Sequence, residues 1–387
     1  MPKARKIRVV IVAGGGRRFE GGVSRAMGYL IDTWQQQDDA PEVRVLDPRG
    51  TGSVLWSPFY LARALTQIVW IFSTGRADIL HINVSSNASS ARKAIVAFTA
   101  SLMRVPYVIH IHSGIYDRYF GKLRGRYRAF TRRMLTHARR VIVLGNHWQH
   151  FLHDEVGVES DRIAVMYNAV PGPDRIDRAN DPDTACRILF LGRLVPGKGV
   201  PELVAALGDA GVASLPWVAT IAGGGDIAAY RTQSAELGIA ERVIFPGWVG
   251  PTAVHELLLS HDVLVLPSHH EGLPMSVLEG MAYALAIVTT PVGAIPEVID
   301  DEATGILVPP RDVDALSAAI ARVVADRGLR ERLSRAARDE YLKRFEIRAY
   351  ASRMLRLYED VLADRPTRDE NPVRRTRDNA ADPVKVD

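Results

Sequence analysis

Cysteine is nearly absent from this chain, since Cys186 is the only one among its 387 residues. No disulfide can form within the chain, and zinc sites built from two or four cysteines are excluded. Such low cysteine usage is typical of proteins in a reducing compartment, so we expect a cytoplasmic location.

Long hydrophobic runs are also absent. A membrane-spanning helix needs ~20 mostly apolar residues, and the most apolar candidate, Phe59–Phe72, is interrupted by Arg63 and Gln67. The run Ile7–Ala13 is too short for the core of a signal peptide, and it leads into Gly14-Gly15-Gly16 rather than a cleavage site. We expect a buried first strand that enters a glycine-rich turn.

The composition is that of a globular protein, with 47% hydrophobic and 24% charged residues. The length favours two domains. The formal net charge of +5 permits an anionic partner without identifying it.

Short β-branched runs alternate with amphipathic stretches throughout the chain. In the first half the expected strands are Ile7–Ala13, Val43–Leu46, Asp78–Ile82, Tyr107–His112, Val141–Leu144 and Arg162–Met166. In the second half they are Arg187–Leu191, Trp217–Ile221, Arg242–Phe245, Asp262–Leu266, Ala286–Thr289 and Gly305–Val308. Runs without strict alternation are typical of strands covered on both faces. The rhythm predicts a parallel doubly wound α/β sheet in each half.

Pro171-Gly172-Pro173 and the polar residues up to Thr184 interrupt this rhythm. We therefore expect an N-terminal domain at 1–170, a linker at 171–186 and a C-terminal domain at 187–346. A helix at about 347–362 is expected to complete the first domain, and the tail 365–387 lacks apolar periodicity and is expected to be disordered. Doubly wound sheets bind ligands at the carboxyl ends of their strands. If those ends face each other, the ligand cleft lies between the domains.

The loop that follows the strand Arg187–Leu191 carries two cations, Arg193 and Lys198. It leads into a helix start at Gly199–Pro201, where backbone N–H groups and the helix dipole favour an anion. With the two side-chain charges added, a diphosphate fits this loop. The alternative is a loop whose cations only face solvent. A Walker A loop is excluded by the spacing.

Two glutamates follow the strand Asp262–Leu266. Glu271 lies in the turn, and Glu279 lies on a helix expected to start near Pro274. Carboxylates accept paired hydrogen bonds from vicinal diols, so one glutamate suits a sugar and the other a ribose. A hydrolase pair would need its carboxyl groups ~5–10 Å apart around one bond, which this spacing does not exclude.

Together, the G-R-L-x-x-x-K-G loop and the E-x7-E pair resemble the retaining glycosyltransferases of family 4. Further matching segments are Gly223-Gly224-Gly225, Phe245–Val249, Gly293–Glu297 and Gly305–Pro309. The likeness is strong over about 187–345 and looser over 1–170. It implies the α/β fold named GT-B, with two facing Rossmann-like domains built on parallel doubly wound sheets. Gly280, where the family usually has Ala, and Ala286, where it often has Pro, depart from the pattern.

The resemblance also implies a role for each matching residue of the second half. Arg193 and Lys198 would neutralise the donor diphosphate. Glu271 would contact hydroxyls of the donor sugar, and Glu279 would hold the ribose. Residues expected to contribute backbone or side-chain contacts to the donor are Gly272, Leu273, Pro274 and Met275 beside the sugar, and Trp248 within the nucleobase segment 245–249.

In the first half, Gly21-Gly22 resembles the family's glycine pair that lets backbone approach the diphosphate, although the segment does not form a G-x-G-x-x-G fingerprint. His112 ends the strand Tyr107–His112 and matches the family's active-site histidine. His110 lies on the same strand face. A satisfied core histidine is the usual alternative for both, and we expect it to hold for His110.

Near these residues the sequence has no acidic cluster that would suggest a metal site. Asp312-Val313-Asp314 has D-x-D spacing, but it precedes a helix, which predicts Asp312 as an N-cap. We expect the leaving diphosphate to be stabilised by Arg193, Lys198 and helix N-termini, without a metal or other cofactor. The resemblance implies a retaining reaction and leaves open same-face attack or a covalent intermediate.

Residues 119–140 are expected to form a helix with one apolar stripe and a basic remainder. The stripe holds Tyr119, Phe120, Leu123, Tyr127, Phe130 and Met134, and the basic residues are Lys122, Arg124, Arg126, Arg128, Arg132, Arg133, Arg139 and Arg140. Such a face predicts contact with anionic lipid on the inner side of the plasma membrane, beside a lipid-linked acceptor. The alternative is a helix packed on the first sheet with a solvated basic face. Arg17 and Arg18 are further candidates for contact with a charged acceptor.

The main hypothesis is a retaining hexosyltransferase that uses a UDP-sugar or GDP-sugar and a saccharide or lipid-linked acceptor, in surface polysaccharide or glycolipid synthesis. One alternative is a GT-B sugar-nucleotide epimerase or hydrolase, which needs no separate acceptor. Another is a nucleotide-binding protein without turnover. The presence of all four charged residues of the two motifs argues against it. A dehydrogenase is disfavoured because the dinucleotide fingerprint fails. Nucleic acid is not an expected partner, since no stacking-aromatic module accompanies the charge.

Overall fold

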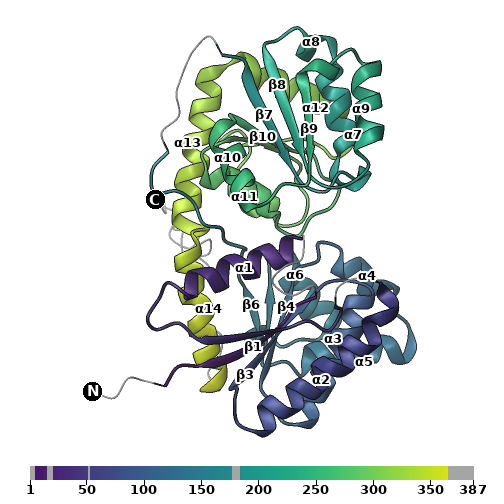
Figure 1. Cartoon of the computed structure of the whole chain (residues 1–387), viewed down its shortest axis with the longest axis vertical. Coiled ribbons are helices and arrows are strands. Elements are labelled where there is room, and N and C mark those ends of the chain that lie inside the picture. The colour runs from purple at the N-terminus through teal and green to yellow at the C-terminus, as the bar shows by residue number, and fades with distance from the viewer. Residues whose placement is uncertain (1–4, 15–20, 51–52, 177–183, 365–387) are drawn as a thin grey trace, which may run out of the picture. The chain divides into compact units, whose positions relative to one another are not determined.

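The computed structural model describes residues 5–14, 21–50, 53–176 and 184–364 of the chain. Gly15, Gly16, Arg17, Arg18 and the predicted disordered tail at 365–387 lie outside this described part. The chain divides into two compact units (Figure 1). The first combines the residues up to Tyr167 with those from Ala349 onward, and the second is Asn168–Arg348.

The first unit is built on a six-stranded sheet with the order β2-β1-β3-β4-β5-β6. Every neighbouring pair is parallel. The strands are β1 (Arg8–Val12), β2 (Glu42–Leu46), β3 (Ile79–Val84), β4 (Tyr107–Ile111), β5 (Arg140–Val143) and β6 (Ile163–Val165). The helices are α1 (Gly22–Trp34), α2 (Ser57–Ser73), α3 (Ala88–Leu102), α4 (Tyr116–Lys122), α5 (Gly125–Thr136), α6 (Asn146–Phe151) and α14 (Ile347–Leu362). Shorter helical turns are η2 (Val54–Trp56), η3 (Leu152–Val156) and η4 (Ser160–Arg162).

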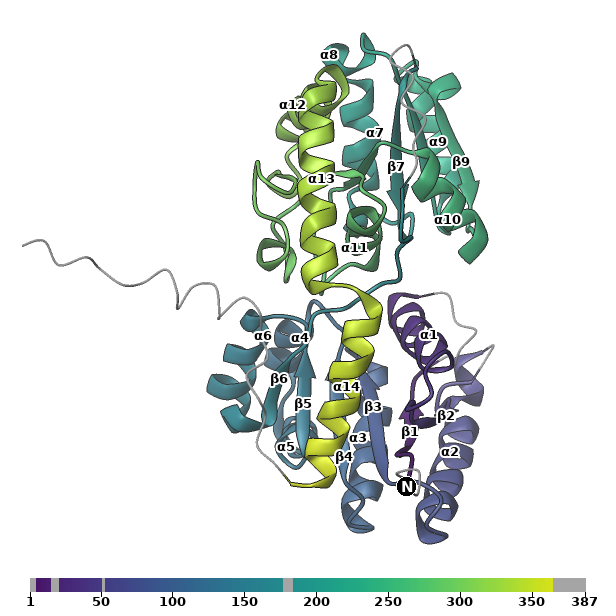
Figure 2. The ribbon, with the colours of Figure 1, turned by 90° about the vertical axis from the view of Figure 1, so that its left-hand side faces the viewer.

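Helices cover both faces of this sheet. On one face α2, α3 and α5 lie side by side, and the ring centroids of Phe98 and Phe130 are 5.9 Å apart (Figures 1 and 2). On the other face α1 and α14 meet. There Trp34 packs on Tyr358 with ring centroids 6.1 Å apart, and its Nε1 donates to the Ala351 carbonyl at 3.3 Å. Strands covered in this way need apolar residues on both sides, which explains their continuous β-branched runs.

The predicted single helix over 119–140 is wrong. It is divided into α4 and α5 because Leu123 and Arg124 have extended backbone angles, and Gly125 has a φ of 53° at the start of α5. Arg139 lies in the turn after α5, and Arg140 is buried as the first residue of β5. Within the predicted apolar stripe, Phe120, Leu123 and Met134 are buried, whereas Tyr127 is exposed. The extended pair rotates α5 relative to α4, so one helical wheel cannot describe both.

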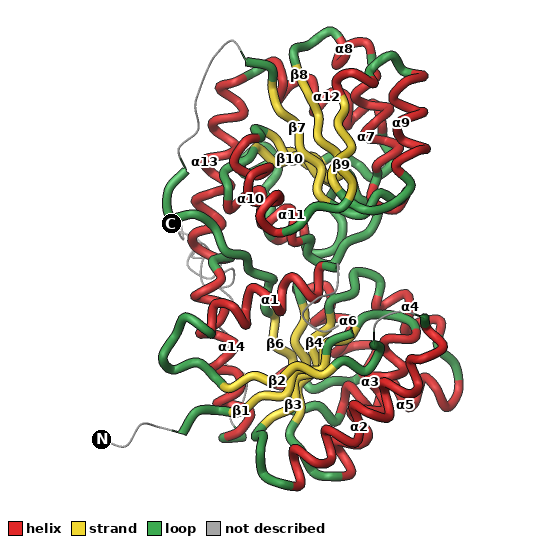
Figure 3. The backbone as a smooth tube through the Cα atoms, viewed as in Figure 1, coloured by secondary structure: helices red, strands yellow, loops and turns green. Residues whose placement is uncertain are grey.

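The second unit holds another six-stranded sheet, with the order β12-β11-β10-β7-β8-β9 and parallel pairs. Its strands are β7 (Cys186–Leu191), β8 (Trp217–Ala222), β9 (Val243–Gly247), β10 (Val263–Leu266), β11 (Ala286–Thr289) and β12 (Ile306–Leu307). Its helices are α7 (Val200–Gly208), α8 (Ala210–Ala213), α9 (Ile227–Glu236), α10 (Pro251–Ser260), α11 (Met275–Ala282), α12 (Val313–Ala325) and α13 (Arg327–Arg344). Shorter turns are η5 (Pro196–Lys198), η6 (Ala240–Arg242) and η7 (Ile295–Glu297). Figure 3 shows each sheet as a central layer between helices.

The predicted fold class, two Rossmann-like domains with parallel doubly wound sheets, is confirmed by these two sheets. The prediction for Asp312 is also confirmed, because its side chain caps α12 by accepting a hydrogen bond from the Ala315 N–H at 2.9 Å. Within the described part of the chain, no helix combines the length and the apolar character needed to cross a membrane.

The second unit begins at Asn168, three residues before the segment in which the sequence places the linker. The reason is a set of contacts with α13. Tyr341 donates its hydroxyl hydrogen to the Val170 carbonyl at 3.0 Å, and Arg338 donates to the Pro173 carbonyl at 2.5 Å. Part of the proline- and glycine-rich segment is therefore held against the second unit.

Candidate active site

The loop that connects β7 to α7 packs tightly against the end of β10. Gly199, the N-cap of α7, has a φ of 72°, and a Cβ there would stand 2.0 Å from the Pro267 carbonyl oxygen. Only glycine fits such a position without strain. The His269 N–H donates to the Gly197 carbonyl at 3.0 Å, which fixes the same two loops to each other. Two loops that lie far apart in the sequence are thereby brought together.

Lys198 and Glu271 meet across these two loops. The Lys198 Nζ lies 2.5 Å from the Glu271 Oε1, and the Ser268 hydroxyl donates to the same oxygen at 2.7 Å. Glu271 is buried, while the Lys198 side chain is 28% exposed. Among the described residues, none bonds to the Glu271 Oε2. One carboxylate oxygen is thus held by a cation and a hydroxyl, and the second is left for a ligand hydroxyl.

Arg193 lies in the same loop with an exposed side chain. The neighbouring Leu194 is anchored, because its N–H donates to the Gly224 carbonyl at 2.9 Å. Helix α7 begins six residues after Leu194, at Val200, and presents its first N–H groups there. An exposed cation beside an anchored loop and a helix N-terminus is a suitable arrangement for an anion.

The turn from Glu271 into α11 is shaped by contact with the segment after β11. Gly293 has a φ of 61°, and a Cβ there would stand 2.2 Å from the Glu271 carbonyl oxygen. The Ala294 N–H donates to the Gly272 carbonyl at 2.9 Å. Gly272, Leu273, Pro274 and Met275 are all buried as the chain enters α11. This close backbone packing sets the position of the Glu271 carboxylate.

The remaining predicted donor residues lie on α11 and after β9. Glu279 lies on α11 and is only 1% exposed. Trp248 directly follows β9 and is 53% exposed. Glu279 follows β10 in the chain and Trp248 follows β9, so each comes after the carboxyl end of a strand.

Two further residues support this site and were missed in the sequence. Ser268 holds Glu271, and Asn168 donates from Nδ2 to the Leu273 carbonyl at 2.9 Å. The position of Ser268, three residues before Glu271, is the only sequence signal for its role. Asn168 has no such signal, because it lies 105 positions from Leu273.

In the first unit, His112 follows β4 and is oriented by Asn83. The His112 Nε2 lies 2.7 Å from the Asn83 Oδ1, and the Asn83 Nδ2 points to the Val12 carbonyl at 3.5 Å. The Val12 carbonyl oxygen can only accept a hydrogen bond, so the Asn83 NH₂ group faces it and the Asn83 Oδ1 faces His112. Because Oδ1 is also an acceptor, the His112 Nε2 must be the donor. This places the proton on Nε2 and leaves the Nδ1 lone pair as an acceptor for a ligand hydroxyl.

His112 is the outermost member of a row of three histidines. The ring centroids of His110 and His112 are 3.9 Å apart, and those of His81 and His110 are 5.4 Å apart. The His81 Nδ1 lies 2.7 Å from the Tyr358 hydroxyl. Burial lowers the pKa of His81 and of His112 to about 3 and holds that of His110 well below its usual value. The row is therefore neutral near pH 7.

We expect the stability of the protein to fall as the pH drops below ~6.5, because unfolded histidines titrate there. The fold keeps all three neutral, so below that pH the unfolded state binds more protons. For each histidine, the free energy of unfolding then falls by up to ~1.4 kcal/mol for every pH unit. This decrease continues until the pH reaches the lowered pKa of that histidine in the folded protein. Urea titrations at several pH values measure the slope. His110→Leu should reduce the slope of unfolding free energy against pH by the contribution of one proton. An unchanged slope would contradict this account.

The predicted glycine pair lies at the start of α1, which begins at Gly22 with Gly21 as its N-cap. Both are exposed. Within the described ranges, no group of three His, Cys, Asp or Glu side chains is placed to hold a metal ion.

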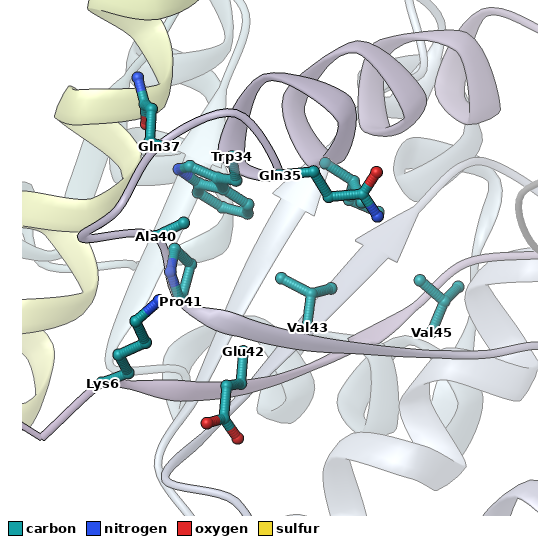
Figure 4. A pocket seen from close by; sticks show the side chains of 10 residues that line it. Lys6, Trp34, Gln35, Gln37, Ala40, Pro41, Glu42, Val43 and Val45 are labelled. Carbon is teal, nitrogen blue, oxygen red and sulfur yellow. The ribbon is translucent and has the colours of Figure 1, made fainter.

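A separate open pocket of about 430 Å³ lies in the first unit between the end of α1 and β2 (Figure 4). Trp34, Gln35, Glu42 and Val43 are among its lining residues. None of the predicted site residues lines it, so it is not the site described above.

Comparisons with known proteins cover both halves of the chain. Residues 3–169 match the family model described as a glycosyl transferase 4-like domain. Residues 174–340 match the model described as glycosyl transferases group 1.

Several curated relatives are glycosyltransferases. The chain is 26% identical to an uncharacterised glycosyltransferase of Methanocaldococcus jannaschii over 82% of this chain and 84% of that protein. It is 26% identical to the 2-deoxystreptamine glucosyltransferase of Streptomyces kanamyceticus over 82% of this chain and 86% of that enzyme. Glycogen synthase of Mycobacterium tuberculosis is 30% identical, but the match spans only 51% of its length and 54% of this chain.

Solved structures with the same fold include sucrose-phosphate synthase from Thermosynechococcus elongatus. It has a TM-score of 0.74 at 19% identity, over 93% of this chain and 100% of that one. Anabaena HepE in complex with UDP and glucose has a TM-score of 0.71 at 16% identity, over 92% of this chain and 100% of that one. At these identities the likeness shows the fold, and the predicted GT-B fold is confirmed.

Proposed function

Since this chain belongs to the family 4-like glycosyltransferases of the GT-B type, we propose that it moves a hexosyl unit from a nucleoside diphosphate sugar to a saccharide acceptor with retention of anomeric configuration. The observation that carries this proposal is the 2.5 Å contact of Lys198 with Glu271. It joins a cation suited to a diphosphate with a carboxylate suited to sugar hydroxyls.

The donor diphosphate binds Arg193, Lys198 and the N-terminus of α7 in this proposal. Without donor, Lys198 offsets the charge of the buried Glu271. When a diphosphate binds, Lys198 has two anionic partners, and the Glu271 Oε2 accepts from sugar hydroxyls. As the bond from the sugar to the diphosphate breaks, negative charge develops on the phosphate oxygen, and these fixed positive groups stabilise it.

A UDP-sugar or GDP-sugar is the proposed donor. Support comes from HepE, whose structures contain UDP with glucose or UDP-glucose. Trp248 and the backbone around it are proposed to meet the base, and Glu279 the ribose. His112 accepts a hydroxyl hydrogen of the bound sugar at Nδ1, because Asn83 holds the proton on Nε2.

A panel of nucleotide sugars tests the proposed reaction. We expect the purified protein to release UDP or GDP from one donor, and release should require a saccharide acceptor. The product should keep the anomeric configuration of the donor, which NMR of the product measures. Release at full rate without acceptor would instead assign a hydrolase, and conversion of the donor into another nucleotide sugar would assign an epimerase.

Transfer should persist in excess EDTA. The leaving diphosphate is stabilised here by Arg193, Lys198 and backbone N–H groups, so no divalent ion is needed. Initial rates with and without EDTA should agree within about twofold, a margin that allows for weak effects of ionic strength. Loss of activity that Mn²⁺ or Mg²⁺ restores would contradict this leaving-group mechanism.

We further propose a lipid-linked acceptor and a place of action on an anionic membrane surface. The first unit presents an apolar ridge on η2, α2 and α3, defined as Leu55, Trp56, Phe59, Val69, Trp70, Ile95, Phe98 and Leu102. Leu55 is 88% exposed, Leu102 70% and Trp56 64%. Exposed apolar residues of this size at helical spacing on two adjacent helices mark an interaction surface.

Charge selects anionic lipid as the occupant of this ridge. Neither α2 nor α3 contains Asp or Glu. Exposed arginines that flank the ridge or lie on the adjacent α5 are Arg63, Arg76, Arg104, Arg126 and Arg133. Apolar side chains with a basic rim are typical of helices that lie in a membrane interface. The proposed contact therefore shifts from the predicted helix at 119–140 to α2 and α3, with α5 as its basic neighbour.

A further inference from the structure

Glu202 and His269 form a mostly buried pair beside the candidate site, and the proposed reaction uses neither of them. Glu202 lies in the first turn of α7, and His269 lies in the loop after β10. The His269 Nε2 donates to the Glu202 Oε1 at 2.8 Å. The His269 side chain is 10% exposed and the Glu202 side chain 17%. The pair therefore joins the same two segments of the chain that carry Lys198 and Glu271.

A carboxylate in the first turn of a helix has an ordinary explanation, which is its attraction to the positive end of the helix dipole. That attraction is also available to an exposed side chain. The Glu202 carboxylate is instead buried, and its Oε2 accepts no hydrogen bond from any described residue. Because an unpaired oxygen of a buried carboxylate is costly, the contact with His269 explains the placement of Glu202 better than the dipole does.

The backbone of His269 is fixed to the same helix start as its ring. Its N–H donates to the Gly197 carbonyl at 3.0 Å, two residues before the N-cap of α7. Ser268 and Glu271 lie close to His269 in the chain, and the Ser268 hydroxyl donates to the Glu271 Oε1 at 2.7 Å. A rotation of the anchored His269 would therefore displace the carboxylate that is proposed to meet the sugar.

The first turn of α7 is itself held in place by α9. The Gln233 Nε2 donates to the Pro201 carbonyl at 3.0 Å, and the helices α7 and α9 lie side by side (Figure 1). Glu202 directly follows Pro201, so it gives His269 an anchor that is fixed to the body of the unit. Lys198 directly precedes the N-cap of α7. The pair thus fixes the loop after β10 against the helix start that the proposed diphosphate site uses.

We propose that Glu202 and His269 are positioning residues of the donor site. Their hydrogen bond holds the Glu271 carboxylate at the distance from the start of α7 that the sugar of the donor requires. This inference rests on the proposed transferase function and adds to its donor site two residues that do not contact the donor. Displacing a binding group by about 1 Å can lower a rate by ~100-fold.

Initial rates with the nucleotide sugar that the panel above identifies, and calorimetry with its nucleoside diphosphate, UDP or GDP, test the pair in the full-length protein. Glu202→Leu and His269→Phe should each lower kcat at least ~10-fold, while the Kd for the nucleoside diphosphate stays within about threefold. The nucleoside diphosphate lacks the sugar that Glu271 is proposed to meet. Glu236→Leu, which changes an exposed glutamate of α9 in the same unit, is the matched control and should change neither quantity.

Two more variants separate positioning from a purely structural role. Glu202→Gln keeps an oxygen that accepts from the His269 Nε2, so its kcat should stay within about threefold of the wild type. The double variant Glu202→Leu, His269→Phe leaves neither partner unpaired, so it should fold even if a single variant does not. Both substitutions remove the same contact, and the double variant should therefore lose no more kcat than either single variant.

The outcomes distinguish this inference from the transferase itself. Folded variants with a lower melting temperature and an unchanged kcat overturn the positioning role and leave the donor site intact. A loss in Glu202→Gln as large as that in Glu202→Leu also overturns it, as does a loss of UDP or GDP binding that matches the loss of kcat. A wild-type protein that transfers no sugar from any donor overturns the proposed function first.

Discussion

Lys198→Ala and Arg193→Ala should each weaken UDP binding by ~10- to 100-fold, whereas Glu271→Gln should spare UDP binding and abolish transfer. A charge-assisted hydrogen bond is worth ~1.5–3 kcal/mol, which sets this range for the cations. Glu271 is proposed to contact the sugar and not the diphosphate. Glutamine keeps its size and its ability to accept from Ser268, but it loses the charge that pairs with Lys198.

Calorimetry with UDP and initial rates of transfer separate the two roles. Arg332→Ala, an exposed arginine on α13 of the same unit, is the matched control and should change neither quantity. Ser268→Ala should lower the rate with little effect on UDP binding, because it releases one partner of Glu271. If Glu271→Gln lost UDP while Lys198→Ala kept it, the two assignments would be reversed.

The wild-type protein should sediment with vesicles of anionic phospholipid, and the triple variant Trp56→Ser, Phe59→Ser, Trp70→Ser should remain in the supernatant. Each large apolar side chain contributes ~1.5–3 kcal/mol when it is fully removed from water. These three are already partly covered, so we expect a loss of at least ~100-fold in vesicle binding. All three are more than one-third exposed, so the fold should hold.

The basic rim gives an independent measure of the same contact. Arg126→Glu with Arg133→Glu should weaken vesicle binding by ~1 kcal/mol or more per residue, and salt should reduce the difference. Leu342→Ser, which changes an exposed leucine of the second unit, is the control for the apolar triple variant and should not alter vesicle binding. Transfer to a water-soluble acceptor analogue should persist in every variant. A wild-type protein that stays unbound at low salt removes the membrane proposal and leaves the transferase proposal unaffected.

The sequence determined the architecture because its local patterns agree with one another. β-Branched runs such as Val9–Val12 and Val263–Leu266 are apolar on both faces, as buried parallel strands must be. The cations at 193 and 198 and the glutamates at 271 and 279 were found from their positions after strands. The carboxyl ends of parallel strands share one edge, so these residues were expected close together before any contact was known.

Other features depend on packing between distant residues. Ser57–Ser73 is apolar around most of its circumference, so its sequence did not show that Phe59 and Trp70 would face outward while Ile68 and Ile71 are buried. The break between α4 and α5 depends on two extended residues that a helical wheel treats as helical. A long-range contact has no local pattern, as the link from Asn168 to Leu273 shows.

The sequence by itself therefore determined which residues end the strands, and with them most of the candidate site. Only the tertiary structure decided which atoms meet. It pairs Lys198 with Glu271 across 73 positions, sets the proton of His112 through Asn83, and buries Lys93 close to Arg92. The physical reason is that periodicity reports the average surroundings of a residue, whereas a hydrogen bond, a tautomer or a buried charge depends on one particular neighbour that the fold supplies.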